Sequence, residues 1–156
     1  MFYSAVGEVF MAQVPIAGGM LALEPGAPRL LASRCGPCGA LAFPAASGCA
    51  RCGSTEQETV RLSPGGKIWT WTSQEFRPVS PPYTGPETAE NFTPYYVGFV
   101  ELAEGLCVET RLTGFGGRPP RIGQEVSLVA LPFRTDEDGN EVVLPAFEPA
   151  SGGHGA

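Results

Sequence analysis

Four cysteines of this chain form two tight pairs in its first third. The pairs are Cys35 with Cys38 and Cys49 with Cys52, and ten residues separate them. A tetrahedral zinc ion needs four soft ligands at about 2.3 Å, and two such pairs joined by a short hairpin supply them. A glycine follows each pair, and glycine accepts the left-handed backbone conformation that a sharp turn requires. The spacing therefore predicts that all four cysteines bind one zinc ion.

Two other uses of these thiols fit the sequence less well. A disulfide framework needs an oxidising compartment, whereas residues 1–8 lack the basic region and long apolar run of a secretory signal. It would also leave the fifth cysteine, Cys107, unpaired. A thioredoxin-like site uses one such pair at the start of a helix, not two around a glycine-rich turn. Because four cysteine ligands leave no open coordination position, we expect one structural zinc per chain. Because the N-terminus lacks a secretory signal, we expect a cytoplasmic protein.

The remaining residues offer little for catalysis. Acid–base and nucleophilic chemistry usually recruits a histidine beside the nucleophile, but the only histidine, His154, lies in a glycine-rich stretch at the C-terminus. Cys107 is a candidate reactive thiol, although a lone cysteine on a strand is usually part of the packing. Glu101, Glu104 and Glu109 gather around one hairpin, where charged side chains are normally just solvated. We therefore expect no catalytic residue in this chain.

A loop rich in glycine and arginine is a candidate site for coenzyme A. Arg111, Arg118 and Arg121 lie in or beside residues 113–123, and arginine pairs well with phosphate groups. Phe115 in the same loop offers a ring that could stack on the adenine. The alternative is a flexible connection between two strands, and no helix N-terminus follows as it does in a dinucleotide-binding motif.

A second candidate is the connection at residues 78–94, which carries five prolines. Connections of this length in compact domains are usually functional or disordered, and proline favours a preformed shape with a lower ordering cost on binding. Tyr83 and Phe92 are the side chains that we expect to anchor a partner there. The alternative is a passive surface loop.

The elements that must position these residues are predicted to be short strands. Glycine (21 residues) and proline (16 residues) are abundant, which disfavours long helices and favours strands linked by turns. Beyond a turn-rich joint at residues 63–66, five runs are rich in β-branched and aromatic residues, and the first three follow one another as a meander. This pattern suits a five-stranded OB-fold barrel. The five runs are residues 67–76, 95–102, 106–112, 124–131 and 140–144.

The expected organisation has four parts. Residues 30–63 are too few to bury a self-sufficient core, but metal binding can contribute roughly 10 to 16 kcal/mol of folding free energy to such a module. The parts are an N-terminal arm at residues 1–29, a zinc ribbon at 30–63, the OB-fold at 64–149 and a disordered tail at 150–156.

Side-chain alternation distinguishes two of the strands. In the run 106–112, Val108 and Leu112 share one face while Cys107 and Glu109 share the other, as expected of a half-buried strand. The run 95–102 has apolar residues on both faces. Its outer face therefore needs a cover, which is the zinc ribbon, another protein or the barrel itself.

The charge of the chain argues against binding to nucleic acid through phosphates. The formal net charge is −6 at pH 7, and the ten basic residues are scattered, whereas such proteins show a basic face. Binding of single-stranded nucleic acid remains the alternative function because OB barrels and zinc ribbons both serve it, and Trp69, Trp71 and Phe99 offer rings for stacking. No apolar stretch approaches the roughly 20 residues of a membrane span. We therefore expect no nucleic acid and no membrane among the partners.

The order of these motifs resembles a family of bacterial and archaeal proteins in which a rubredoxin-like zinc ribbon is fused to an OB-fold. The motifs are the two CxxCG pairs, then residues 66–72 (GKIWTWT), 94–105 (PYYVGFVELAEG) and 144–147 (LPAF). Members are encoded beside thiolases and related acyl-CoA enzymes. Residues 81–87 and 104–109 look most similar to members that form the small subunit of a thiolase such as benzoylsuccinyl-CoA thiolase.

The resemblance implies a non-catalytic subunit that binds a thiolase-like catalytic subunit. Such a hetero-oligomer would complete the acyl-CoA site at or near the interface and act in the degradation of aromatic or fatty acyl-CoA. One departure from the family pattern is that many members begin with an amphipathic pair of helices, which residues 1–29 do not resemble.

Overall fold

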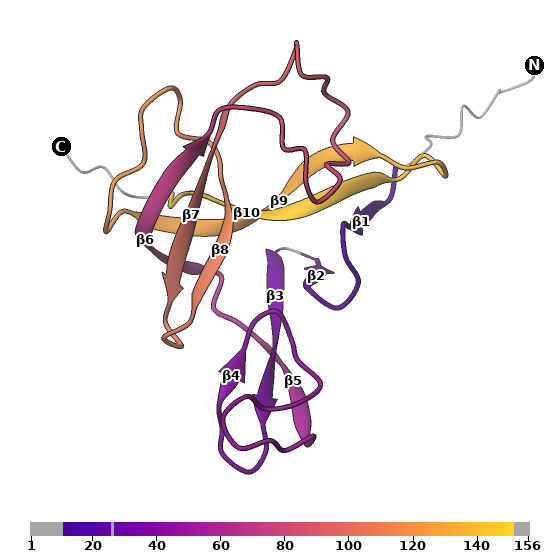
Figure 1. Cartoon of the computed structure of the whole chain (residues 1–156). Coiled ribbons are helices and arrows are strands. Elements are labelled where there is room, and N and C mark those ends of the chain that lie inside the picture. Colours follow the sequence, from indigo (N-terminus) through magenta and orange to yellow (C-terminus); the bar gives the residue numbers. More distant parts are fainter. Residues whose placement is uncertain (1–10, 26, 152–156) are drawn as a thin grey trace, which may run out of the picture.

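The computed structural model describes residues 11–25 and 27–151, and all regular structure in these ranges is β-strand (Figure 1). Within them there is no helix long and apolar enough to cross a membrane. The predicted mainly β chain is confirmed. The strands are β1 (Gln13–Pro15), β2 (Leu21–Glu24), β3 (Ala27–Cys35), β4 (Leu41–Ala42), β5 (Gln57–Arg61), β6 (Gly65–Gln74), β7 (Tyr95–Leu102), β8 (Cys107–Leu112), β9 (Glu125–Thr135) and β10 (Glu141–Pro149).

Five of these strands close into a barrel. β6, β7 and β8 form an antiparallel meander, and β8 continues to β10 as a parallel pair. β9 pairs antiparallel with both β10 and β6, which closes the sheet. Closure pairs strands that would otherwise be exposed sheet edges. The predicted five-stranded OB-fold barrel is confirmed.

The last two barrel strands are longer than the sequence predicts. β9 runs to Thr135 and β10 runs to Pro149, although each contains a proline, which cannot donate to a neighbouring strand. The other edge of β10 pairs with β1 as far as Val143 and with β8 from Ala146. Pro145 lies between these two segments, so its missing N–H falls where β10 changes partner. Its carbonyl oxygen accepts a hydrogen bond from the hydroxyl of Thr110, at 2.8 Å.

The barrel core is built by strict side-chain alternation. Val108, Thr110 and Leu112 of β8 are buried, while Cys107 and Glu109 are exposed, which confirms the predicted half-buried strand. Full burial of an aliphatic or aromatic side chain stabilises the fold by roughly 1.5 to 3 kcal/mol. The largest fully buried side chains of the barrel are Phe147, Ile68, Val100, Val108, Val126 and Val143.

A β-bulge in β6 separates two tryptophans that simple alternation would place on one face. The register of β6 against β7 shifts between Ile68 and Thr70, so Trp69 is the extra residue. A bulge of this kind re-aims the side chains that follow it. Trp71 therefore packs against the core, whereas Trp69 points outward and is 59% exposed.

The first part of the chain is tied to both the barrel and the ribbon. β1 pairs in parallel with β10, and β2 forms an antiparallel pair with the first half of β3. β3 continues into the ribbon, where it pairs with β4 and β5. Leu30, Ala32 and Leu62 at the base of the ribbon belong to the same buried cluster as the barrel core. Residues 1–10 and 26 of the predicted arm and residues 152–156 of the predicted tail lie outside the described residues.

Candidate functional site

The two cysteine pairs are presented by matching backbone turns. β3 ends at Cys35, at the end of the ribbon that lies away from the barrel (Figure 1). The N–H of Gly39 donates to the carbonyl of Cys35 at 2.8 Å, and the N–H of Gly53 donates to the carbonyl of Cys49 at 2.9 Å. Both glycines have positive φ, 72° and 77°, which a residue with a side chain adopts only with strain. The two knuckles therefore depend on the glycine that follows each pair.

The four sulfur atoms converge on one point. They lie within 4.8 Å of one another, and the Sγ–Sγ distance is 3.5 Å both for Cys35 with Cys52 and for Cys38 with Cys49. Four sulfurs at about 2.3 Å around a tetrahedral zinc ion would be about 3.8 Å apart. The donor set and its spacing thus fit a closed four-thiolate zinc site.

Backbone N–H groups favour the thiolate form of Cys49, one of the four sulfur ligands. The backbone N–H groups of Cys52 and Arg51 point at the Cys49 sulfur and lower its pKa to about 6, and the Arg51 nitrogen lies 3.4 Å from that sulfur. Metal ligation needs deprotonated cysteine. Cys107, the remaining cysteine, is exposed on β8 of the barrel.

The proline-rich connection is folded against the barrel. Tyr83 stacks edge-on against Phe92 and against Phe133 of β9, with ring centroids 6.2 and 5.7 Å apart, and Phe92 meets Tyr95 at 5.7 Å. Arg77 donates from Nε to the carbonyl of Glu87 at 2.8 Å. Tyr83 and Phe92 therefore anchor the loop to its own barrel, and their contact with a partner stays a prediction.

Arg111 belongs to the same aromatic cluster. Its guanidinium carbon lies 3.6 Å from the ring centroid of Tyr95 and 5.6 Å from that of Phe133. Burial raises the pKa of the Tyr83 phenol, and the nearby positive charge of Arg111 opposes that rise. Arg111 therefore links β8 to aromatic rings of β7 and β9.

The other residues predicted to bind coenzyme A lie in the connection between β8 and β9. Phe115 is half-buried, packs against the core and stacks edge-on with Tyr96 at 6.3 Å. Arg118 and Arg121 are exposed in the same connection. The structure thus separates the four candidates into Arg111 and Phe115, which make internal stacking contacts, and Arg118 and Arg121, whose side chains face solvent.

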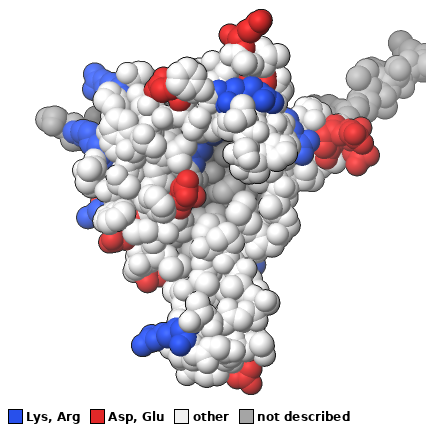
Figure 2. Space-filling model, in the orientation of Figure 1, with Lys and Arg blue, Asp and Glu red and all other residues white. Residues whose placement is uncertain are grey.

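A hollow of about 630 Å³ lies between the barrel and the ribbon. Its floor is the outer face of β7 and β8, including Val97, Phe99 and Glu109, and its opposite wall includes Met20 and Phe43. Figure 2 shows the hollow on this face of the molecule, with mostly uncharged walls. The ribbon therefore faces the outer side of β7 without filling the space above it.

Sequence analysis did not find this hollow, because its walls come from segments far apart in the chain. Phe43 directly follows the short β4, and Met20 precedes β2 in a segment without clear periodicity. The available signal was the two-sided apolar pattern of residues 95–102, which indicated that the outer face needs a cover.

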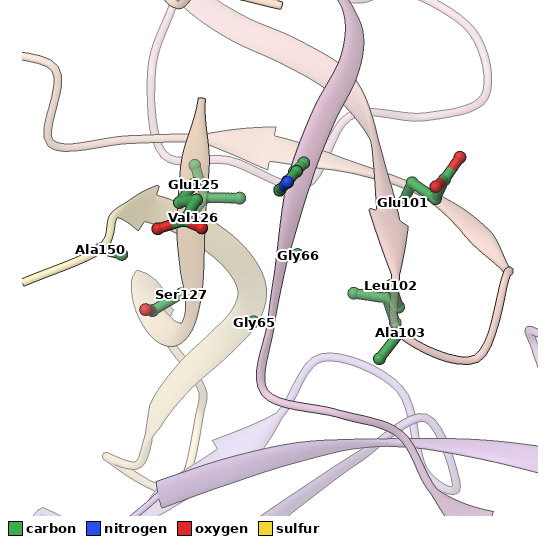
Figure 3. A pocket seen from close by; sticks show the side chains of 10 residues that line it. Gly65, Gly66, Glu101, Leu102, Ala103, Glu125, Val126, Ser127 and Ala150 are labelled. Atoms are coloured by element: carbon green, nitrogen blue, oxygen red, sulfur yellow. The ribbon is translucent and has the colours of Figure 1, made fainter. Parts of the chain in front are cut away.

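A second hollow, of about 480 Å³, lies beside the start of β6. A Cβ atom on Gly66 would lie 2.8 Å from Cγ1 of Val100 and would also meet the carbonyl oxygen of Glu101, so close strand packing explains this glycine. In Figure 3, the bare strand at Gly65 and Gly66 runs between Glu125, Val126 and Ser127 on one side and Glu101, Leu102 and Ala103 on the other. This hollow is a consequence of how the strands cross.

Comparison with known protein families yields two adjacent matches. Residues 24–58 match a family described as "ChsH2, rubredoxin-like zinc ribbon domain", and residues 59–131 match one described as "ChsH2, C-terminal OB-fold domain". Together the matches cover more than half of the chain. The zinc-ribbon description agrees with the four-sulfur geometry.

Relatives of this chain carry different enzyme names. The benzoylsuccinyl-CoA thiolase subunit BbsA of Thauera aromatica is 34% identical over 121 residues, which cover 78% of this chain and 76% of that protein. A probable enoyl-CoA hydratase alpha subunit of Thermomonospora curvata is 33% identical over 122 residues, which cover 78% of this chain. The chain spans only 34% of that second relative.

A solved structure supports the same relationship. A chain of an "Ltp2-ChsH2(DUF35) aldolase" superimposes with a TM-score of 0.58 and 30% sequence identity, over 78% of this chain and 84% of that chain. The shared architecture therefore includes both the ribbon and the barrel.

Proposed function

Because the chain belongs to the ChsH2 family of zinc-ribbon and OB-fold proteins, we propose that it is a non-catalytic subunit of a thiolase-type acyl-CoA enzyme. In this role it binds a catalytic subunit as a hetero-oligomer and helps to shape the acyl-CoA site. The degradation of aromatic or fatty acyl-CoA in the cytoplasm is the setting that such an enzyme would serve.

The observation that carries this proposal is the match to BbsA over most of both chains, since BbsA is a thiolase subunit. The other relatives are named for a hydratase and an aldolase. Three different reactions accompany one ribbon-and-barrel architecture, which favours an accessory role for the shared part. Function must be argued from sites and not from a fold, and a metal ion held by all four clustered cysteines would have no open coordination position.

Zinc in this proposal has a structural role. Cys35, Cys38, Cys49 and Cys52 would hold one ion per chain, and the bound ion would supply folding free energy to the small ribbon. A chain that loses one ligand should therefore lose both the metal and the ribbon's shape.

Coenzyme A contact is a finer part of the proposal. Arg118 and Arg121 are exposed and are the arginines best placed to meet phosphate groups of a CoA bound at the interface. Arg111 and Phe115 would act there through the aromatic contacts that position the neighbouring strands.

The test is to express a tagged chain in its native host and purify the complex. We expect a larger acyl-CoA enzyme, identified by mass, in a fixed ratio to the chain, and acyl-CoA turnover by the complex but not by the isolated chain. Turnover by the isolated chain, or retention on a nucleic-acid column with steep salt dependence, would contradict the proposal.

A metal-ligand variant tests the zinc role in the same experiment. Cys52→Ser should lose zinc, measured by atomic emission, and should no longer assemble with the partner. Cys107→Ser, which changes the cysteine outside the cluster, should retain one zinc per chain. Normal assembly of metal-free Cys52→Ser would separate zinc from the function.

A further inference from the structure

The bulge in β6 exposes an aromatic pair on the outer face of the barrel. Trp69 is 59% exposed and Phe99 is 38% exposed, and their rings meet edge-to-face with centroids 6.3 Å apart. Tryptophan is enriched among the residues that carry most of the binding energy at protein interfaces. A bulge that turns such a ring away from the core, next to a second ring, is an arrangement that the barrel core does not require.

Phe99 of this pair lines the hollow between barrel and ribbon, and Trp69 lies beside it. A smaller hollow of about 210 Å³ on the outer face of β6 and β7 is lined by Trp71, Thr72, Val97, Phe99 and Glu109 among others. Val97, Phe99 and Glu109 also line the hollow of about 630 Å³. The two hollows therefore form one continuous surface, which we call the outer groove, and it ends at Met20 and Phe43.

The groove has a defined charge pattern. Glu109 is exposed and lines both hollows. The guanidinium of Arg111, at one end of the groove, is covered by the ring of Tyr95 at 3.6 Å. The accessible charge at the centre of the apolar surface is therefore a carboxylate, which favours an apolar occupant that carries a basic side chain.

We infer that the outer groove is the docking site for the catalytic subunit, and that it receives an apolar segment of that subunit whose lysine or arginine pairs with Glu109. This inference rests on the proposed function and assigns a surface to it. Trp69 and Phe99 act as the anchor rings, and the ribbon forms the opposite wall of the groove. Phe43 is held across from β7 by its packing against the core, and a metal on the four cysteines would support the ribbon that carries it.

A single-tryptophan variant provides the direct measurement. In Trp71→Phe, the exposed Trp69 is the sole tryptophan of the chain. Adding the catalytic subunit, obtained from the native complex, should shift its emission to shorter wavelength and reduce quenching by acrylamide several-fold. The matched variant Trp69→Phe retains only Trp71, which is partly buried against the core and also lines the smaller hollow, and its emission should shift less than that of Trp69.

Substitutions then measure the contribution of the groove. Trp69→Ala should weaken binding to the catalytic subunit by about 30-fold, as expected of an anchor residue, and Glu109→Lys should weaken it at low salt more than at high salt. Phe76→Ala removes another large apolar side chain, 80% exposed and absent from the lining of both hollows, and should bind as the wild type does. Circular dichroism and zinc content should be unchanged in all three.

Cys107 gives a second readout that does not depend on substitutions. It lines the hollow, and with zinc on the other four cysteines it is the thiol open to alkylation by iodoacetamide. Its alkylation should slow at least tenfold in the complex.

The outcomes separate the inference from the proposed function. If the complex forms while Trp69 emission, Cys107 alkylation and Trp69→Ala affinity stay unchanged, the groove assignment is wrong and the subunit role stands. If no acyl-CoA enzyme assembles with the chain, both are wrong. A Trp69 blue shift that depends only on the concentration of this chain would identify a second copy as the occupant. A blue shift produced by acyl-CoA alone would identify a small-molecule site. Either result overturns the inference.

Discussion

Single residues decide where strands can cross and where a metal can bind in this protein. The glycines after the cysteine pairs have positive φ, which the knuckle turns require, and their spacing made the metal cluster visible in the sequence. Gly66 has a different reason, since any side chain there would meet β7. That contact joins residues more than thirty positions apart, so no local signal in the sequence could distinguish Gly66 from a turn glycine.

Gly66→Ala should destabilise the barrel by about 1 to 3 kcal/mol, because the added methyl group would overpack the contact with Val100 and the carbonyl of Glu101. Urea unfolding followed by fluorescence measures the change. Gly18→Ala is the matched control, because a Cβ there meets no atom within 4 Å, and its midpoint should stay within experimental error. Equal midpoints for wild type and Gly66→Ala would show that β6 and β7 can move apart without loss of stability.

Strands were predictable from the sequence where one face is buried and the pattern is local. The five barrel runs and the alternation in β8 follow directly from apolar and β-branched residues. The bulge at Trp69 was not predictable, because a bulge is set by the register of the neighbouring strand. The same limit applies to β1, whose three residues form a strand only through pairing with β10.

The proline-rich connection behaves as an element of the barrel. Its aromatic residues pack on Phe133 and Tyr95, so its shape depends on side chains from β9 and β7. Sequence analysis identified the anchoring rings Tyr83 and Phe92 and predicted that they serve a partner. In the structure these rings pack internally. The sequence could not predict this packing, because it depends on β9 extending far enough to place Phe133 against the loop.

Phe133→Ala should loosen this loop and lower the free energy of unfolding by about 2 kcal/mol, roughly half of what a fully buried phenylalanine contributes, since Phe133 is half-buried. Amide hydrogen exchange in residues 78–94 should accelerate as well. Phe76→Ala serves as control because that ring is 80% exposed, and it should change stability by less than about 0.5 kcal/mol. Unchanged exchange in Phe133→Ala would mean that the loop holds its shape without β9.

Ribbon and barrel act as one body because their junction is bonded as well as packed. Leu30 and Leu62 of the ribbon base belong to the barrel's buried cluster. Ser63, at the joint, donates from its backbone nitrogen and its hydroxyl to one oxygen of Glu104, at 2.7 and 2.8 Å. The two modules were predictable separately from the sequence, but their junction was not. In the sequence Glu104 is indistinguishable from an ordinary charged residue of a turn.

The junction should be sensitive to acid. Burial raises the pKa of Glu104, but hydrogen bonds from Ser63 and the charge of Arg34 outweigh that effect and hold it below the ordinary value of 4.5. A carboxyl whose pKa is lower in the folded state stabilises the fold above its unfolded pKa and loses this contribution as pH falls through the folded pKa. Wild type should therefore exceed Glu104→Gln in stability at pH 7, and the difference should shrink below about pH 4.5.

Urea midpoints measured across pH 3 to 7 would show this convergence. Glu90→Gln, which alters an exposed glutamate of the proline-rich loop, should parallel the wild type over the whole range. A constant difference between wild type and Glu104→Gln at every pH would indicate that the carboxylate charge has no part in holding the joint.

β10 pairs with β1, β8 and β9, and it is the last strand described along the chain. During synthesis, the ribosome must release this strand before the cylinder can close, while the cysteine cluster has long since emerged. The ribbon can thus bind its metal while β6 to β9 still have unpaired strand edges. At that stage truncated or stalled chains would be prone to aggregate.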